Sequence, residues 1–390
     1  MKYNVQTLNS ISPVYHGTLK DAEYLVGSNV THPDAILVRS ADMHDYAIGE
    51  NLLCVGRAGA GVNNIPLDRM AEAGVVVFNS PGANANAVKE LVVAGLLLAS
   101  RRITEGVEWC RTLADEPDLE KLVEKGKSRF AGPELAGKTL GVVGLGAIGV
   151  LVANMGVSLG MNVLGYDPYI SVDHAWKLSR SVAHATELSE VLEKSDYVTL
   201  HVPLMDSTRG MIDATVLGRM KPGAALLNFS RGGLVDTAAV IEALERERLR
   251  AYVTDFPCRE LIGVKNAVLT PHLGASTPES EDNCVRMVAR QIDDYLKTGS
   301  IVNACNYPNC PLGPVTIPRI ALLHKNVPNV IGAITQHLSA EGLNIENMVN
   351  QSRGALAYTV VDVSARPSEA LIESLRSLET SYRVRLLMPQ

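Results

Sequence analysis

Three short segments of the sequence carry side chains that could together oxidise an alcohol. They span residues 228–236, 254–260 and 270–277, and they supply Arg231, Glu260 and His272 in turn. Hydride transfer from an alcohol needs a base for the hydroxyl proton, and histidine suits this task because it titrates close to neutral pH. A carboxylate bonded to the other ring nitrogen would fix the tautomer, and an arginine can hold a substrate carboxylate through two parallel hydrogen bonds.

A glycine-rich turn, GLGAIG at residues 144–149, is a candidate dinucleotide site. Its first glycine permits a tight turn, its second lets the backbone approach a pyrophosphate, and its third allows the next helix to pack closely on the strand. The N–H groups at the start of that helix would face the phosphates. Asp167 follows the next predicted strand, 18 residues past Gly149, and a carboxylate there accepts ribose hydroxyls and repels a 2′-phosphate. The sequence therefore predicts NAD rather than NADP.

Strands that alternate with helices are expected to position these residues. The predicted strands of the first segment are 3–8, 35–38, 52–55 and 75–78, and those of the second are 139–143, 162–166, 197–201, 224–228, 251–254 and 267–269. This alternation is typical of parallel sheets covered by helices, in which ligands bind at the carboxyl ends of the strands. The glycine turn and the three catalytic segments all follow predicted strands.

The last part of the chain has a different order of elements. Residues 317–390 read as strand, helix, strand, strand, helix, strand, which is ferredoxin-like, and residues 300–318, rich in Pro, Asn and Gly, are predicted to be a linker. The expected fold class is α/β, with two doubly wound parallel-sheet domains and a βαββαβ domain. We expect a substrate-binding domain at 1–95 and 285–305, a Rossmann NAD-binding domain at 96–284, and the ferredoxin-like domain at 317–390.

Several motifs resemble the D-isomer-specific 2-hydroxyacid dehydrogenase family. They are the GLGAIG turn, the Asp167 position, the tripeptide His201-Val202-Pro203, and the stretches NFSRGGLVD and PHLGAST. The resemblance implies that Arg231 binds the substrate carboxylate, that His272 is the acid/base, and that Glu260 orients the histidine. It also implies cofactor contacts along the same strand ends, at Gly144, Gly146, Ala147, Ile148, Gly149, Asp167, His201, Val202, Pro203, Ser230, Asp255, Gly274 and Ala275.

The glutamate departs from the family pattern, which usually reads D-V-F-x-x-E-P. This chain keeps the five-residue step from Asp255 to Glu260 but has leucine where the proline is expected. A surface glutamate beside Arg259 is therefore the alternative interpretation of Glu260.

Two loops of the N-terminal segment could hold an anionic substrate. Arg57 opens the stretch RAGAGVNN, whose glycines expose backbone N–H groups of the kind that bind anions. In the resembling family this loop meets the substrate carboxylate, and the arginine that opens it matches one that reaches a substrate phosphate. The expected substrate-binding residues are Arg39, Ser40, Arg57, Ala58, Gly59 and Asn79, with Lys127 and Arg129 as weaker candidates.

The C-terminal segment resembles an ACT domain, a ligand-sensing fold that pairs across subunits. His324, Asn326 and Asn344 match the serine-binding positions of relatives that carry this domain. Asn329 stands where the family usually has glycine, and asparagine tolerates the left-handed conformation such a turn needs. The alternative is a purely structural dimerisation domain. If serine does bind, the expected moving element is the 300–318 segment with its adjacent hinge.

The whole chain, tail included, is similar to the branch of the family that oxidises D-3-phosphoglycerate to 3-phosphohydroxypyruvate with NAD, the first step of serine biosynthesis. We expect that activity, feedback inhibition by serine and a homo-oligomer. One alternative is a D-2-hydroxyacid dehydrogenase of the lactate or glyoxylate type, although these families usually lack the tail. The other is a non-enzymatic NAD-responsive binding protein, against which the joint presence of Arg231, Glu260 and His272 argues.

Composition narrows the remaining classes. The net charge of −6 gives no general attraction to nucleic acid or to an anionic membrane surface. The longest strongly apolar run, 91–99, is about half of a membrane span. The six cysteines form no CxxC pair and have no zinc-like spacing with histidines, so we expect reduced thiols, no metal and a cytoplasmic location.

Overall fold

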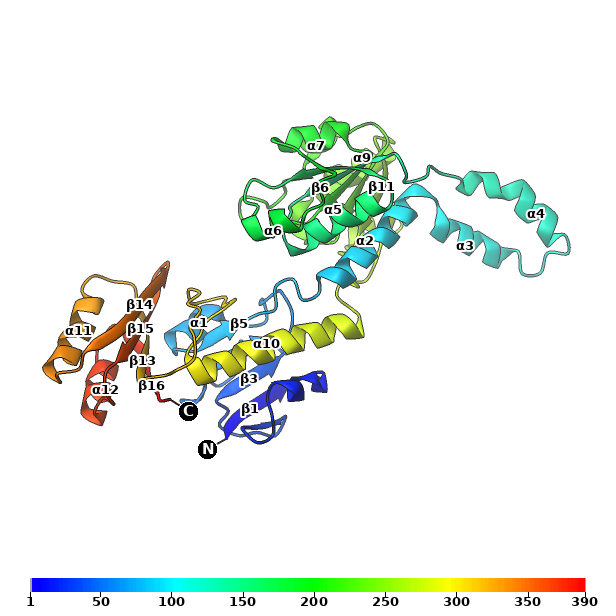
Figure 1. The fold of residues 1–390 in the computed structure, drawn as a ribbon. Helices are drawn as coiled ribbons and strands as arrows, with labels where there is room; N and C mark the ends of the chain where they lie inside the picture. Colours follow the sequence, from blue (N-terminus) through cyan, green and yellow to red (C-terminus); the bar gives the residue numbers. More distant parts are fainter. Residues whose placement is uncertain (1, 390) are drawn as a thin grey trace. The chain divides into compact units, whose positions relative to one another are not determined.

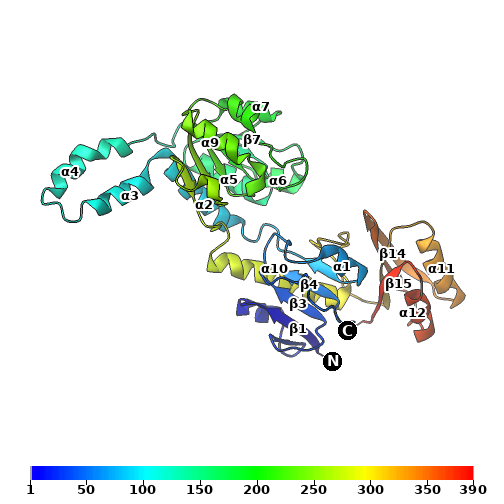
Figure 2. The ribbon, with the colours of Figure 1, turned by 180° about the vertical axis from the view of Figure 1, so that it is seen from behind.

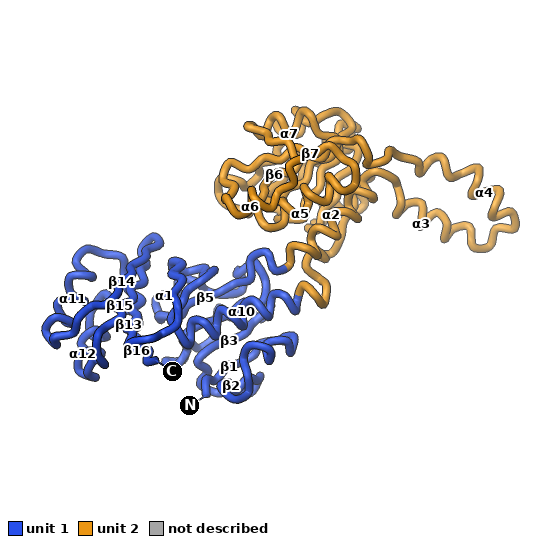
Figure 3. Tube along the Cα trace, viewed as in Figure 1, with its two compact units in different colours: residues 1–83, 281–390 blue, residues 84–280 orange. Residues whose placement is uncertain are grey.

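The computed structural model describes residues 2–389 and divides them into two units (Figures 1 and 3). One unit comprises the residues up to 83 together with those from 281 onward, and the other comprises residues 84–280. The three domains expected from the sequence stay a prediction, because this division does not separate 317–390 from the N-terminal segment.

The first unit is built on a parallel sheet of five strands in the order β2-β1-β3-β4-β5. The strands are β1 (Tyr3–Leu8), β2 (Tyr24–Gly27), β3 (Ala35–Val38), β4 (Cys54–Arg57) and β5 (Val76–Phe78). Around them lie η1 (Pro13–Gly17), α1 (Leu67–Glu72) and α10 (Pro278–Thr298). The aliphatic run of β3 is buried throughout, as expected for a strand covered on both faces. A side chain at Gly56 would meet Ile292 at 2.8 Å, so glycine there lets α10 lie against β4.

The second unit contains a parallel sheet of seven strands in the order β12-β11-β10-β9-β6-β7-β8. The strands are β6 (Thr139–Val143), β7 (Asn162–Tyr166), β8 (Val182–His184), β9 (Tyr197–Leu200), β10 (Ala224–Asn228), β11 (Leu249–Thr254) and β12 (Ala267–Leu269). The helices are α2 (Ala85–Ser100), α5 (Ala147–Ser158), α6 (Val172–Lys177), α7 (Leu188–Lys194), α8 (Ala214–Arg219) and α9 (Thr237–Glu245), with the short turns η3 (Gly232–Leu234) and η4 (Arg259–Leu261). Two apolar clusters flank the sheet, and α2 lies beside α5 in both views (Figures 1 and 2).

A pair of helices in the second unit has no buried residue. α3 (Ile103–Thr112), α4 (Leu119–Gly126) and η2 (Lys127–Phe130) form this excursion between α2 and β6. Its small apolar contact is Trp109 against Phe130, with ring centroids 5.3 Å apart. Within residues 2–389, no helix combines the length and the apolar character needed to cross a bilayer.

The C-terminal sheet is antiparallel, in the order β14-β15-β13-β16. Its strands are β13 (Arg319–Lys325), β14 (Ile345–Arg353), β15 (Leu356–Val363) and β16 (Ser381–Leu387), and its helices are α11 (Val330–Ala340) and α12 (Glu369–Arg376). The order strand, helix, strand, strand, helix, strand is thus confirmed, and with it the expected α/β fold class. One face of this sheet packs on α11 and α12, and its other face joins the core of the first unit through Leu323, Tyr358 and Val360.

The interpretation of residues 300–318 as a linker is wrong for its first half. Ile301 pairs with Cys310 in a β-bridge, and both are buried. The Asn306 side chain donates to Val75 O at 2.8 Å and accepts from Val77 N at 3.0 Å, and the Tyr307 hydroxyl donates to Ala71 O at 2.6 Å. A segment rich in Pro and Asn lacks regular structure but can still pack, because side-chain amides satisfy the backbone groups that a strand would pair.

Candidate active site

The glycine turn lies where the order of the second sheet reverses. β6 is followed in sequence by β7 on one side, whereas β9 lies on the other side, and such a switch point is the usual ligand site of a doubly wound sheet. Gly144 has φ +91, and a side chain there would meet His201 O at 2.7 Å. A side chain at Gly146 would meet nothing within 4 Å. The fold therefore needs glycine at 144 for its own packing, while the backbone at 146 is left open to a ligand at the start of α5.

Asp167 lies beside this turn, as the sequence predicts. Its carboxylate accepts hydrogen bonds from Leu145 N and from Tyr169 N, each at 2.8 Å. An ionised carboxylate has about four acceptor positions, so both oxygens can still accept from ribose hydroxyls. This geometry fits a dinucleotide, with the pyrophosphate at the amino end of α5, where Ala147 and Ile148 begin the helix.

His201 closes the other side of the turn. Its Nε2 is hydrogen-bonded to the Thr199 hydroxyl at 2.9 Å, while its Nδ1 is buried without a hydrogen-bond partner among the described residues. Burial lowers the pKa of His201 to about 3, so the imidazole is neutral and one ring nitrogen remains for a ligand. Val202, the next residue, lies against Gly144, where an added side chain would meet its Cγ1 at 2.9 Å.

The loop that carries His272 is anchored by Asp255. This buried carboxylate accepts from the Thr270 hydroxyl, from Leu273 N and from Gly274 N, each at 2.7 Å. His272 itself is exposed and has φ +56, a left-handed conformation that is uncommon for a side chain with a Cβ. The expected contact of Asp255 with the cofactor stays a prediction. In the structure, Asp255 anchors the loop at 270–274.

The Arg231 loop and the His272 loop both reach the same aromatic ring. Phe256 contacts the His272 imidazole edge-on, with centroids 5.2 Å apart, and a side chain at Gly232 would meet the Cβ of Phe256 at 3.2 Å. The Asn228 side chain donates to Arg231 O at 2.9 Å. Asn228 and Phe256 lie within the segments 228–236 and 254–260 selected from the sequence, but neither was assigned a role. Their position at strand ends is the signal that could have indicated one.

The expected pairing of Glu260 with His272 is not formed. Glu260 is exposed in η4, and among residues 2–389 no hydrogen bond joins it to His272. Its own main-chain N–H and the Cys258 side chain lower the pKa of its carboxyl. Arg231 is also exposed, and its Nη1 donates to Ser230 O at 2.6 Å. The roles of Arg231 and Glu260 therefore stay predictions.

The expected substrate loops come together in the first unit. Val38 and Arg57 are partners in the parallel pairing of β3 and β4, so the loops after these strands leave the sheet side by side. The guanidinium of Arg57 folds over Gly59, which has φ +151. Asn79 donates to Ala60 O at 2.6 Å and thereby braces the same loop.

Arg39 in this unit already has an acidic partner, because its Nη1 donates to Glu281 Oε2 at 2.7 Å. The weaker candidates lie elsewhere. Lys127 pairs with Glu124 in the α4–η2 excursion, and Arg129 stacks over Trp109 at 4.3 Å. Neither belongs to the unit that holds Arg39.

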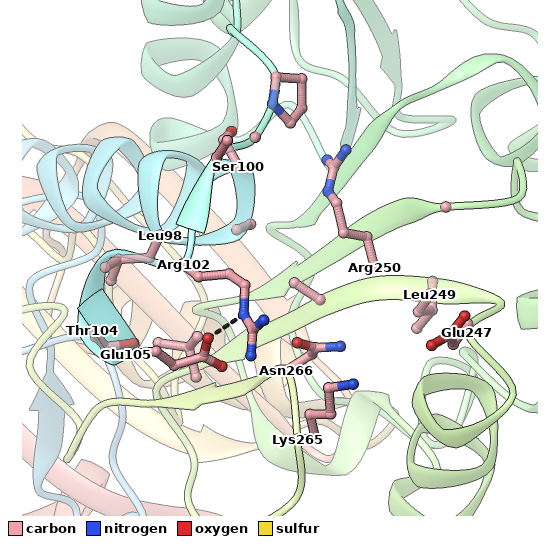
Figure 4. A pocket seen from close by; sticks show the side chains of 17 residues that line it. Leu98, Ser100, Arg102, Thr104, Glu105, Glu247, Leu249, Arg250, Lys265 and Asn266 are labelled. Atoms are coloured by element: carbon pink, nitrogen blue, oxygen red, sulfur yellow. Dashed lines mark ion pairs between the residues drawn. The ribbon is translucent and has the colours of Figure 1, made fainter. Parts of the chain in front are cut away.

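A large cavity of the second unit adjoins the amino ends of the strands, whereas the expected cofactor site lies at their carboxyl ends. It has a volume of about 530 Å³ and is lined by residues that include Arg102, Glu105, Arg250 and Lys265 (Figure 4). Arg250 is at the start of β11 and Lys265 precedes β12, so this cavity adjoins the amino ends of these strands. The glycine turn and His272 follow the carboxyl ends.

The expected effector residues are not gathered within one chain. His324 is buried, with Nε2 bonded to the Thr359 hydroxyl at 2.7 Å and Nδ1 donating to Lys325 O at 2.8 Å, and burial lowers its pKa. Lys325 pairs with Leu356 at one end of β15, whereas Ile345, next to Asn344, pairs with Val363 at the other end. Asn329 has φ +68 at the start of α11, so the turn survives without glycine.

Comparison with known proteins agrees with this fold. The family model for the NAD-binding domain of D-isomer-specific 2-hydroxyacid dehydrogenases matches residues 93–274. D-3-phosphoglycerate dehydrogenase of Escherichia coli is 32% identical over 95% of this chain and 88% of its own length. The enzyme of that name from Methanocaldococcus jannaschii is 36% identical over 75% of this chain, which spans 53% of that longer protein.

A solved structure covers most of the chain as well. D-mandelate dehydrogenase of Rhodotorula graminis, in its apo form, superposes with a TM-score of 0.68 at 25% identity, over 80% of this chain and all of the other. Both the resemblance seen in the motifs and the expected cofactor, NAD, are confirmed by these matches. The chain therefore belongs to the D-isomer-specific 2-hydroxyacid dehydrogenase family, as an NAD-dependent oxidoreductase.

Proposed function

We propose that the protein oxidises D-3-phosphoglycerate to 3-phosphohydroxypyruvate with NAD, the first step of serine biosynthesis. The observation that carries this proposal is the similarity to the E. coli enzyme of that name along nearly the whole chain. The paired ends of β3 and β4 support it, because Arg57 ends β4 opposite Val38, and Arg39 directly follows Val38. Two guanidinium groups suit a phosphate.

The residues that would hold NAD are the turn at 144–149, Asp167 and His201. When bound, NAD supplies the hydride acceptor. His272 accepts the proton of the C2 hydroxyl as the alcohol becomes a ketone, and it returns that proton in the reverse direction. Arg231 holds the substrate carboxylate, and Glu260 orients His272 once its loop turns toward the ring.

The proposed reaction needs the His272 loop in place and Arg231 accessible to the substrate carboxylate. Asp255 and Phe256 fix the His272 loop before substrate arrives, and this preorganisation spares the reaction the cost of ordering it later. Arg231 uses one N–H of Nη1 for its bond to Ser230 O, and two of its other N–H donors can pair with the substrate carboxylate. The exposed position of His272 and Arg231 leaves both side chains accessible to substrate.

NADH formation with D-3-phosphoglycerate, compared with D-lactate under the same conditions, tests the substrate. A wild type that prefers D-3-phosphoglycerate over D-lactate supports the proposal. Arg57→Ala should weaken this preference and leave NADH binding unchanged. Preference for D-lactate would instead assign the chain to the lactate or glyoxylate type. Tight NAD binding without turnover of any 2-hydroxyacid would favour the NAD-responsive binding protein.

We further propose a homo-oligomer that binds serine between C-terminal domains. Asn344 and the His324–Asn326 pair lie at opposite ends of β15, about 23 Å apart at the usual rise of a strand, so one serine contacts both only if a second copy supplies one of them. Both ring nitrogens of His324 are bonded internally, which makes Asn326 and Asn344 the accessible groups. The test is the effect of millimolar serine on activity and thermal midpoint in the wild type and in Asn344→Ala, which should not respond.

A further inference from the structure

α10 is the longest helix that the structure describes, and its carboxyl end meets the C-terminal sheet. The last four carbonyl groups of a helix have no partner within the helix. Here Arg385 of β16 donates to Tyr295 O at 2.9 Å and to Leu296 O at 2.8 Å. Arg319 of β13 donates to Thr298 O at 2.9 Å, and the Tyr358 hydroxyl donates to Gly299 O at 2.8 Å. Arg385 and Arg319 therefore cap carbonyl groups in the last turn of α10, and Tyr358 holds the residue that follows it.

The electrostatics of the contact favour the same arrangement. The carboxyl end of a helix carries a partial negative charge, so cations stabilise it. Arg319 also forms a two-point ion pair with Asp362, at 2.6 and 3.0 Å. For Arg385 no carboxylate partner lies within ion-pair distance among the described residues, and its guanidinium stacks over the Tyr295 ring at 4.7 Å. The helix end is thus the main electrostatic partner of Arg385.

Apolar packing makes this contact part of one core. Leu323, Tyr358 and Val360 of the C-terminal sheet belong to the same buried cluster as Ile292 and Tyr295 of α10. Arg383 extends the contact to the N-terminal segment, donating to Glu50 O and Ala73 O. Arg353 donates instead to Ala304 O, at 3.0 Å, in the segment that follows α10. Within the first unit, the C-terminal sheet thus packs directly against α10.

Near its other end, α10 holds an arginine of the proposed substrate loops. Glu281, in the first turn of the helix, accepts from Arg39 at 2.7 Å. From Glu281 to Leu296 the helix advances about 22 Å at 1.5 Å per residue. Buried side chains of α10 line this path, among them Val285, Val288 and Ile292. One packed helix therefore joins the contact with the C-terminal sheet to the ion pair that orients Arg39.

We propose that the C-terminal domain positions Arg39 through α10, with Arg385 as the positioning residue at the docking contact. The importance of Arg39 for substrate rests on the proposed function, whereas the mechanical link does not. An effector can change substrate affinity only through a difference between two states of such an element. A ligand of the C-terminal domain would thus act by loosening or tightening the cap on α10.

Amide hydrogen exchange in the full-length protein tests the link directly. Arg385→Met removes the two donors but keeps much of the apolar stem, and Arg353→Met is the matched control because it removes an arginine from the same interface away from α10. We expect exchange in Arg385→Met to rise at both 282–288 and 293–299 and to stay unchanged at 87–98 of α2. A rise confined to 293–299, or an equal rise at 282–288 in Arg353→Met, would overturn the proposal.

Kinetics supply the second readout. Coupling between distant sites typically changes affinity by about 5-fold or more. The KM for D-3-phosphoglycerate should therefore rise about 5-fold in Arg385→Met, while kcat stays nearly unchanged. Arg385→Lys keeps a positive charge, so its KM should lie between those of Arg385→Met and the wild type. Parallel loss of kcat and thermal midpoint at constant KM would mean a merely structural role. If Arg385→Met does not fold, Tyr358→Phe removes the hydroxyl that donates to Gly299 O directly after the helix, and the same exchange and kinetic outcomes apply to it. If the wild type does not oxidise D-3-phosphoglycerate, the proposed function fails while exchange still decides the link.

Discussion

The carboxylate of Asp255 accepts a hydrogen bond of 2.7 Å from the main-chain amide of Gly274. The same carboxylate also binds the Leu273 amide and the Thr270 hydroxyl, so it holds residues on both sides of His272. A buried carboxylate with several N–H and O–H donors is a strong anchor, because hydrogen bonds to a charged group are stronger than neutral ones. The geometry of the proposed base therefore depends on a residue that never needs to touch the substrate.

Asp255→Asn should separate this positioning role from simple loss of fold. An amide has one acceptor oxygen, so the two main-chain amides and the Thr270 hydroxyl cannot all be satisfied. Loss of a hydrogen bond to a charged group costs about 1.5–3 kcal/mol, and we expect kcat to fall while the far-ultraviolet circular dichroism is preserved. Steady-state kinetics measure the change, and full activity in Asp255→Asn would contradict the anchoring role.

His272→Ala tests the proposed acid/base. Loss of a general base typically lowers the rate by about 10²–10⁴, and we expect kcat to fall at least that far. Calorimetry should show NADH binding close to that of the wild type, because the glycine turn and Asp167 are untouched. His184→Ala, on the exposed strand β8, is a matched control that should keep full activity. Near-normal turnover of His272→Ala would remove this residue from the mechanism.

Asp167→Ala should change the choice of cofactor. The Asp167 carboxylate is fixed beside the turn by Leu145 N and Tyr169 N, so its removal takes away both the acceptor for ribose hydroxyls and the charge that repels a 2′-phosphate. We expect kcat/KM for NAD to fall, and the ratio of kcat/KM for NAD to kcat/KM for NADP to fall with it. An unchanged ratio would show that another group reads the ribose.

The order of elements was largely predictable from the sequence. Strands 35–38, 139–143 and 224–228 are buried aliphatic runs bounded by turn residues, and the structure has them at the predicted bounds. β2 and β8 were missed because both are short edge strands with few buried side chains. The packing of 300–310 was also missed, because an irregular segment that buries Tyr307 and Ile301 has no periodicity to detect.

The site was predictable only in part. The spacing of Gly144, Gly149 and Asp167 follows a known pattern, and that pattern alone placed Asp167 beside the glycine turn, where the structure has it. The anchoring role of Asp255 and the contact of Phe256 with His272 depend on which loops meet in space, and no spacing rule reports that. The ion pair of Arg39 with Glu281 joins residues far apart in the chain, so it too required the structure.

His201 should make the apo protein sensitive to acid. Its folded pKa of about 3 lies below the ordinary value of 6.5, because burial disfavours the charged ring. Between these values the unfolded chain binds a proton that the folded chain does not, so the stabilisation is complete above pH 6.5 and is lost progressively as the pH falls toward 3. At pH 5.5, one unit below the unfolded pKa, the loss of stability is about 1.4 kcal/mol.

His201→Gln cannot titrate, so its thermal midpoint should fall less than that of the wild type between pH 8 and 5.5, measured without NAD. Parallel pH profiles for the two proteins would show that His201 does not titrate on unfolding in this range.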